Sequence, residues 1–225
     1  AANVRYARKN MPLQAGENTL SFLPLGHSYG LAFELLFPFS LGVHITFLTK
    51  TPSPQVIMKA FSEIKPDLIL SVPLIIEKIF NNQIVPQISK PHMKVLLKVP
   101  GLNSIIYKKI FTKLNIVFGG KFKELVIGGA AFSPNAEAFF KRIGFPFAIG
   151  YGMTECGPLI SYASWKEFRP GAAGKPVDTL EVKIDSPDPI NVIGEILIKG
   201  ENVMNGYYKN ESATKESFTE DGWLK

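Results

Sequence analysis

The chain alternates short apolar runs with segments of helical spacing, and this alternation limits its fold more than any other feature. The runs are rich in Leu, Ile, Val and Phe: Leu20–Leu25, His44–Thr49, Leu68–Val72, Leu125–Gly128 and Phe147–Gly150. Strands that are apolar on both sides are typical of a parallel sheet with both faces covered. We therefore predict an α/β fold with a largely parallel sheet and helices on both faces.

The segments between these runs predict the covering helices. They are Leu31–Ser40, Pro54–Ile64, Leu74–Val85 and Pro134–Ile143. Proline is favoured at the first position of a helix, where it loses no hydrogen bond, and this supports starts at Pro54 and Pro73. Ser133 directly before Pro134 is a typical N-cap.

After about Ala163 the sequence changes to short strands separated by proline and glycine. Glu181–Asp185 and Val192–Lys199 are two such strands. Short strands bounded by turn residues predict a β-rich unit. We therefore divide the chain into a partial α/β subdomain over residues 1–162 and a smaller, truncated β-rich subdomain over 163–225.

A glycine turn after the last apolar run gathers groups that suit a nucleotide phosphate. It reads Gly150-Tyr151-Gly152-Met153-Thr154-Glu155. Glycines allow backbone N–H groups to face a ligand, Tyr151 can stack on a base, and Thr154 can hydrogen-bond a phosphate. Glu155 offers hard oxygen ligands to a divalent cation. The alternative is a plain connection in which Glu155 satisfies free N–H groups of the next helical turn.

Two further segments accompany this turn. Upstream, Glu124–Ala131 is a strand that runs into glycines, and downstream Gly194–Tyr208 is a strand followed by a Gly-Tyr-Tyr turn. In this order the three segments resemble the adenylate-forming (AMP-binding) superfamily. Leu23–Gly30 and Phe218–Lys225 resemble the corresponding parts of long-chain fatty acid–CoA ligases within it.

The resemblance covers almost the whole chain and implies both a fold and an activity. The fold is the N-terminal domain of an adenylate-forming enzyme, with a distorted barrel-like β subdomain. The activity is that of an ATP-dependent acyl-CoA synthetase, which activates a fatty acid as acyl-AMP and transfers it to coenzyme A. ATP, Mg²⁺ and coenzyme A are the implied cofactors and co-substrates.

The resemblance also assigns roles to residues. Thr154, Glu155 and His27 take catalytic positions: Thr154 at the α-phosphate, Glu155 as the Mg²⁺ ligand and His27 between the acyl and phosphate sites. The nucleotide-binding positions are Gly128, Gly129, Ala130, Gly150, Tyr151, Gly152, Met153 and Thr154. The alternatives are a structural histidine, a core tyrosine and an ordinary strand-to-helix turn. Gly30 replaces a residue that is commonly charged in long-chain ligases, which leaves the acyl-chain length open.

In the resembled family a phosphate loop precedes the segment that starts this chain, and a ribose-binding aspartate and a lysine-bearing domain follow its end. We therefore expect a fragment of a larger enzyme that is inactive in isolation. Two alternatives stay open. One is a fatty acyl-AMP ligase that loads a carrier protein, and the other is a non-catalytic module that binds acyl groups or nucleotide.

Positive charge is concentrated in one segment. The chain has a net charge of +6, but Lys90–Lys123 alone holds eight lysines and no acidic residue. Apolar residues at near-helical spacing lie between the lysines, which is typical of an amphipathic, interfacial element. We hypothesise peripheral contact with an anionic membrane, the alternative being a solvated helical face that packs on the core. No nucleic-acid-binding motif accompanies the charge, so nucleic acid is not an expected partner.

The remaining features bear on location. The single cysteine, Cys156, excludes an internal disulfide and suits a reducing compartment. There is no signal-peptide pattern, and the most apolar window, Gly30–Leu48, carries Glu34, Pro38 and His44, which argues against a membrane span. We expect a cytoplasmic protein that is peripheral at the inner membrane surface, and the sequence leaves the oligomeric state open.

Overall fold

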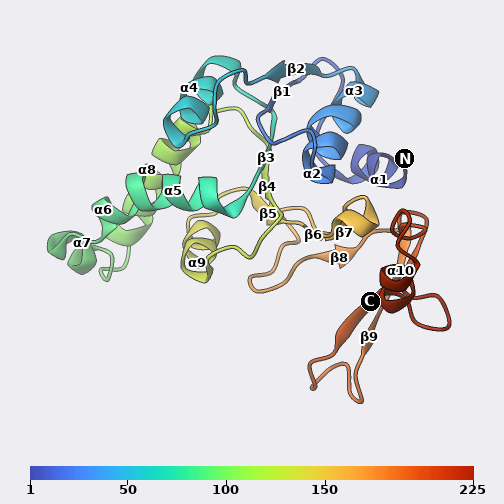
Figure 1. The fold of residues 1–225 in the computed structure, drawn as a ribbon. Helices are drawn as coiled ribbons and strands as arrows, with labels where there is room; N and C mark the ends of the chain where they lie inside the picture. The colour runs from blue at the N-terminus through green and yellow to red at the C-terminus, as the bar shows by residue number, and fades with distance from the viewer.

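The computed structural model describes residues 1–225 and contains two parallel sheets (Figure 1). One sheet pairs β1 (Asn18–Ser21) with β2 (His44–Phe47). The other has the order β3 (Leu68–Ser71), β4 (Glu124–Ile127), β5 (Phe147–Ile149). All neighbours in both sheets are parallel, which confirms the predicted largely parallel α/β fold.

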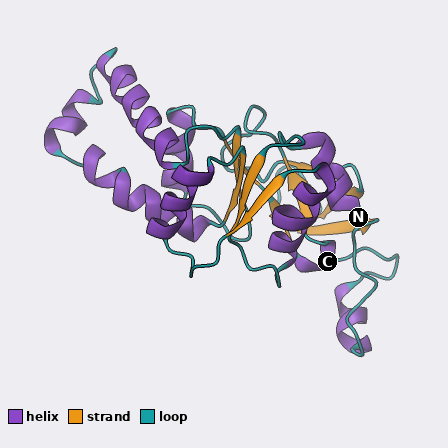
Figure 2. Ribbon diagram, turned by 90° about the horizontal axis from the view of Figure 1, so that it is seen from above, coloured by secondary structure: helices purple, strands orange, loops and turns teal.

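Helices lie on both sides of these strands, as Figure 2 shows from above. Their bounds are α1 (Ala2–Asn10), α4 (Pro54–Ile64), α5 (Pro73–Gln83), α6 (Val85–Ile88), α7 (Pro91–Leu96), α8 (Leu102–Val117) and α9 (Pro134–Arg142). Helices α4, α5 and α9 begin at the prolines that the sequence indicated, and Ser133 is the N-cap of α9. None of the helices is both long enough and apolar enough to cross a membrane.

The structure differs from the prediction in two places here: the helical segment between β1 and β2, and the end of β1. Helix α2 (Ser28–Gly30), the π-helix η1 (Leu31–Leu36) and α3 (Phe37–Leu41) follow one another without a break. The preceding strand ends at Ser21, four residues before the predicted end. It ends there because the N–H groups of Phe22 and Leu23 donate to the Glu34 carboxylate, at 2.9 and 2.8 Å, instead of to a strand.

The C-terminal part is β-rich, as predicted, but its sheets are open. The elements are β6 (Tyr151–Gly152), the 3₁₀ turn η2 (Thr154–Cys156), β7 (Leu159–Tyr162), β8 (Lys175–Pro176), β9 (Leu180–Asp185), β10 (Glu195–Gly200) and α10 (Glu211–Ser217). Strands β6, β7 and β8 form one antiparallel sheet and β9 and β10 form another, and neither closes into a barrel. The boundary between residues 162 and 163 stays a prediction.

Two hydrophobic clusters hold these parts together. The large one fills the space between the parallel sheet and its helices, with rings such as Phe140 and Phe145 whose centroids are 5.1 Å apart. The small one joins Cys156 and Ile160 to Ile198 and Leu224. Burial raises the pKa of the Cys156 thiol to about 11, so the thiol stays protonated at neutral pH and acts as a packing group.

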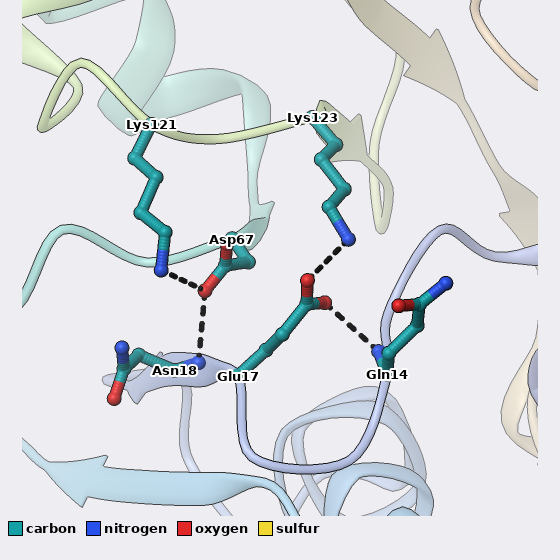
Figure 3. Close-up of polar contacts among 6 residues, drawn as sticks. All are labelled: Gln14, Glu17, Asn18, Asp67, Lys121 and Lys123. Carbon is teal, nitrogen blue, oxygen red and sulfur yellow. Dashed lines mark hydrogen bonds and ion pairs between the residues drawn. The ribbon is translucent and has the colours of Figure 1, made fainter.

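Ion pairs connect the starts of three strands (Figure 3). Asp67, whose side chain is only 2% exposed, accepts from Lys121 Nζ and from the Asn18 N–H, both at 3.0 Å. Lys123 pairs with Glu17 in the turn before β1. Two of the eight lysines of the basic segment therefore pair with carboxylates of the fold.

Candidate functional site

The carboxyl ends of β4 and β5 bring the two predicted glycine turns together. Ile127 and Ile149 are register partners at the ends of these parallel strands. The Gly150 N–H donates to the Ile127 carbonyl at 2.9 Å, and a Cβ added to Gly128 would lie 3.4 Å from the Gly150 carbonyl oxygen. The two turns therefore share one edge of the sheet, where ligands of open α/β sheets commonly bind.

A cavity of about 590 Å³ opens at this edge. Five of the predicted site residues line it: His27, Gly129, Gly152, Met153 and Thr154. A small adjoining cavity of about 50 Å³ shares Gly129 and Gly152 with the first and is also lined by Gly128, Gly150 and Tyr151. Ala130 and Glu155 line neither cavity. The structure thus brings most of the predicted residues to one place, while Ala130 lies exposed beside it.

Two glycines of the site are required by the backbone. A Cβ at Gly152 would lie 2.1 Å from the Pro158 carbonyl oxygen, so no side chain fits between β6 and the return strand. Gly129 has a φ of +87°, which residues with a side chain rarely adopt. Close backbone packing therefore requires a glycine at 152, and the left-handed backbone favours one at 129.

Tyr29 lies between the two turns, a position that the sequence did not indicate. It lines both cavities, and its hydroxyl donates to the Val126 carbonyl at 3.2 Å. A Cβ at Gly128 would touch its ring at 3.4 Å. Burial raises the pKa of the Tyr29 phenol, so it remains a neutral donor. Its place two residues after His27 in the same segment was the only sequence signal for it.

Glu34 supports one wall of the cavity from below. One carboxylate oxygen accepts from the Ser21 hydroxyl at 3.1 Å and from the N–H groups of Phe22 and Leu23, and the other has no partner. The side chain lies on η1 and is 1% exposed. Burial raises its pKa to about 7. In the sequence, Glu34 was only an argument against a membrane span.

Glu155 is the acidic side chain of the glycine turn at 150–155, and it lies on η2. Its Oε1 accepts from the Tyr207 hydroxyl at 2.6 Å, and this bond raises the pKa of the Tyr207 phenol. No group of three or more His, Cys, Asp or Glu side chains is placed to hold a metal. Magnesium in phosphate sites is commonly held by one or two carboxylates together with the phosphates and water. Glu155, with its second oxygen unpaired, fits such a one-carboxylate site.

The turn that carries Thr154 and Glu155 is held by distant parts of the chain. Asn202 donates to the carbonyls of Cys156 and Leu159 at 2.9 and 3.1 Å, and Asn3 donates to the Cys156 carbonyl at 3.0 Å. The Met204 N–H donates to the Glu155 carbonyl at 2.7 Å. The Gly194–Tyr208 segment therefore positions the turn, and Tyr207 and Asn202 are site-supporting residues that the sequence did not identify.

Comparisons with known proteins agree with this architecture. The family model described as AMP-binding enzyme matches residues 1–208. A chloroplastic long-chain-fatty-acid–[acyl-carrier-protein] ligase of Arabidopsis thaliana, AEE15, is 28% identical over 98% of this chain and 37% of its own length. Long-chain-fatty-acid–CoA ligase 1 of Saccharomyces cerevisiae is 31% identical over 93% of this chain and 33% of its own length. The chain thus spans little more than a third of these relatives.

Solved structures share the fold. O-succinylbenzoate coenzyme A synthetase (MenE) of Bacillus subtilis in complex with AMP has a TM-score of 0.72 at 23% identity, covering 99% of this chain and 40% of that one. MatB of Rhodopseudomonas palustris has a TM-score of 0.73 at 20% identity, covering 99% and 39%. At this level of identity the likeness concerns the fold alone.

Proposed function

Because the chain belongs to the AMP-binding enzyme family, we propose that it is the nucleotide- and acyl-binding part of an ATP-dependent acyl-CoA synthetase. The protein activates a fatty acid as acyl-AMP and passes the acyl group to coenzyme A. The observation that carries the proposal is the convergence of the 128–130 and 150–154 turns at one edge of the sheet, beside two adjoining cavities that share Gly129 and Gly152. The long-chain ligases among the relatives support a fatty acid as the substrate class.

The residues of the two turns bind the nucleotide. Gly128 and Gly129, with Ala130 beside them, present a wall with little side-chain bulk to one face of the adenine, and Tyr151, a residue that is 39% exposed, covers the other face. Thr154 lies in the wall of the cavity with its hydroxyl free to donate to an α-phosphate oxygen. Preplaced donors of this kind stabilise the charge that builds on phosphate oxygens while the carboxylate attacks the α-phosphorus and pyrophosphate leaves.

Glu155 would hold a magnesium ion through its free carboxylate oxygen, while the Tyr207 hydroxyl donates to the other oxygen. When bound, the ion neutralises charge on the phosphates and orients them for attack by the carboxylate. Tyr207 restricts the rotation of the Glu155 side chain, so that the ligand oxygen is preorganised.

The acyl group lies in the apolar part of the same cavity. Phe22, Leu23, Val72 and Ile75 line it, and His27 stands exposed at its edge. An imidazole at this place can donate to a bound carboxylate or phosphate oxygen and then move away. A Cβ at Gly30 would lie 2.6 Å from the Pro24 carbonyl oxygen, so a charged side chain has no room there with this backbone.

A second candidate is supported by one of the relatives. AEE15 is named as a ligase that acts with acyl carrier protein. In this reading the adenylate site is the same and only the acceptor thiol differs. Supplying the protein and a fatty acid with ATP and either coenzyme A or acyl carrier protein distinguishes the two.

The test of the adenylate site is direct binding. Isothermal titration with a non-hydrolysable acyl-adenylate analogue is run on the wild-type protein, on Thr154→Val and on Thr112→Val. Thr112 is the matched control, because its exposed hydroxyl bonds only to the Lys108 carbonyl of its own helix at 3.0 Å. Loss of one hydrogen bond to a charged phosphate predicts about tenfold weaker binding for Thr154→Val. Thr112→Val is expected to bind the analogue as tightly as the wild type.

Fatty-acid-dependent exchange of pyrophosphate into ATP gives the chemical readout, measured with this segment in the full-length enzyme because the segment alone is expected to be inactive. It is expected to fall in Thr154→Val and in Glu155→Gln, with the Glu155→Gln defect relieved in part by excess magnesium. Unchanged analogue binding and exchange in Thr154→Val would place the nucleotide elsewhere and end the proposal.

A further inference from the structure

The fold divides the eight lysines of the basic segment into two that form ion pairs and six that do not. Lys121 and Lys123 are engaged in the ion pairs of Figure 3. The other six lysines form no ion pair and are exposed: Lys90, Lys94, Lys98, Lys108, Lys109 and Lys113. We call residues 90–113, which comprise α7, the 97–101 turn and most of α8, the helical arm.

The helical arm extends away from the sheets, as the upper left of Figure 2 shows. Its outer part presents large apolar side chains to solvent between the lysines. Val95 is 64% and Ile105 is 55% exposed, and Leu96, Val99 and Leu102 are also exposed. These five residues cluster around the turn between α7 and α8.

The inner part of the arm is fixed to the core. Ile110 and Leu114 are buried, and the rings of Tyr107 and Phe111 lie against Phe139 and Phe145 with centroids 6.2 and 6.0 Å apart. Packing thus accounts for one face of α8 and leaves the α7–α8 turn without a partner. The arm is therefore a supported projection with an apolar, basic tip.

No acidic side chain within the arm compensates its charge. The nearest acidic residues along the chain are Glu77 and Glu124. The Glu77 carboxylate accepts from the Ser133 N–H at 2.8 Å, and the Glu124 carboxylate accepts from the Tyr162 hydroxyl at 2.9 Å and the Trp165 N–H at 2.8 Å. Six uncompensated positive charges around exposed aliphatic side chains match a surface that is anionic above and apolar below.

We propose that the tip of the helical arm docks on an anionic lipid surface. Lys94, Lys98 and Lys108 lie against the headgroups, and Val95, Val99 and Ile105 enter the boundary with the acyl chains. Basic side chains near such a surface each strengthen binding about fivefold, and buried aliphatic groups add to this. The proposal does not depend on acyl activation.

Co-sedimentation with vesicles tests the electrostatic part. The triple variant Lys94, Lys98 and Lys108→Glu is compared with Lys50, Lys166 and Lys215→Glu, which reverses three exposed, unpaired lysines outside the arm. Both variants have the same net charge. With vesicles of phosphatidylcholine and phosphatidylglycerol, the arm variant is expected to bind at least about a hundredfold more weakly than wild type, and the control close to wild type.

The apolar part is tested by tryptophan placement. Val99→Trp is expected to shift its emission to the blue with these vesicles, because the indole enters the acyl boundary. Ile193→Trp is the control, since this side chain is 100% exposed in the β9–β10 loop, and its emission is expected to stay unchanged. Added salt should weaken the binding of the wild type by screening.

Equal loss of vesicle binding in both triple variants, or no blue shift in Val99→Trp, would overturn the proposal. Binding of the wild type to a DNA duplex with no binding to vesicles would also overturn it and assign the arm to nucleic acid. Circular dichroism of each variant verifies that the arm remains helical, and the two tryptophan variants leave all lysines in place.

Discussion

The sheet region and the tip of the helical arm both carry lysines and aliphatic side chains, but the two regions differ in which of these side chains are paired or buried. At the sheet, Lys121 and Lys123 pair with carboxylates, and Glu34 is buried where it accepts backbone N–H groups. At the tip, lysines are unpaired and aliphatic side chains are exposed. The difference shows that a charged segment of sequence is not one functional unit, because packing decides which of its charges are free.

The largest expected effect tests the division of α8 into a side that faces the core and a side that faces solvent. Leu114 and Ile116 lie two residues apart on α8 and are 0% and 65% exposed. Leu114→Ala should lower the free energy of unfolding by about 2–5 kcal/mol, since it leaves a cavity in the core. Ile116→Ala should change it by less than about 0.5 kcal/mol. Similar losses in urea unfolding for both would show that the α8 face is not divided in this way.

The next effect concerns the buried carboxylate of Glu34. Its pKa in the folded protein is about 7, above the ordinary value of 4.5. The folded state therefore holds its proton to higher pH than the unfolded state does, and stability falls as the pH rises from about 4.5 to 7. The expected loss from this group is about 3 kcal/mol, taking 1.36 kcal/mol for each pH unit of the difference.

Glu34→Gln should flatten this part of the stability curve, measured by urea unfolding across the pH range. Burial also raises the pKa of Glu124 to about 7, so a smaller slope remains in this variant. Glu63→Gln, on the exposed face of α4, should retain the full slope. A curve for Glu34→Gln that matches wild type would show that this carboxyl is ionised normally in the fold.

The smallest expected effect contrasts an ion pair whose carboxylate is buried with one whose carboxylate is exposed. Asp67 serves Lys121 and the Asn18 N–H, whereas Glu63 faces Lys59 at 3.9 Å with both side chains well exposed. Asp67→Ala should cost about 1–3 kcal/mol, because it leaves a backbone donor without a partner. Glu63→Ala should cost no more than about 0.5 kcal/mol. Thermal unfolding of the two variants makes the comparison, and equal midpoints would remove the distinction between the buried and the exposed carboxylate.

Much of the fold could be predicted from the sequence. Helix α4 has the predicted bounds, and β3, β4 and β5 lie within one or two residues of theirs. Prolines at helix starts and fully apolar strands give strong local signals, so these elements follow from nearby residues alone. Both glycine turns were found for the same reason.

The errors occur where a distant side chain decides the local structure. The early end of β1 depends on Glu34, which is thirteen residues beyond Ser21 and bonds to its hydroxyl. The attachment of Glu155 to Tyr207 joins residues that are 52 positions apart. Neither contact leaves a periodic pattern in the sequence, so pattern reasoning did not identify Glu34 or Tyr207 as parts of the site.

The sequence by itself determined the parallel α/β architecture, the family and the two glycine turns, because each depends on the residues of one continuous segment. Only the tertiary structure decided that the turns meet at one edge of the sheet beside two adjoining cavities, that Tyr29 lies between them, and that two of eight lysines in the basic segment pair with carboxylates. These outcomes depend on which strand ends lie side by side and which side chains packing leaves without a partner. Contacts between segments that are far apart in the sequence determine both the neighbouring strand ends and the side chains left without a partner.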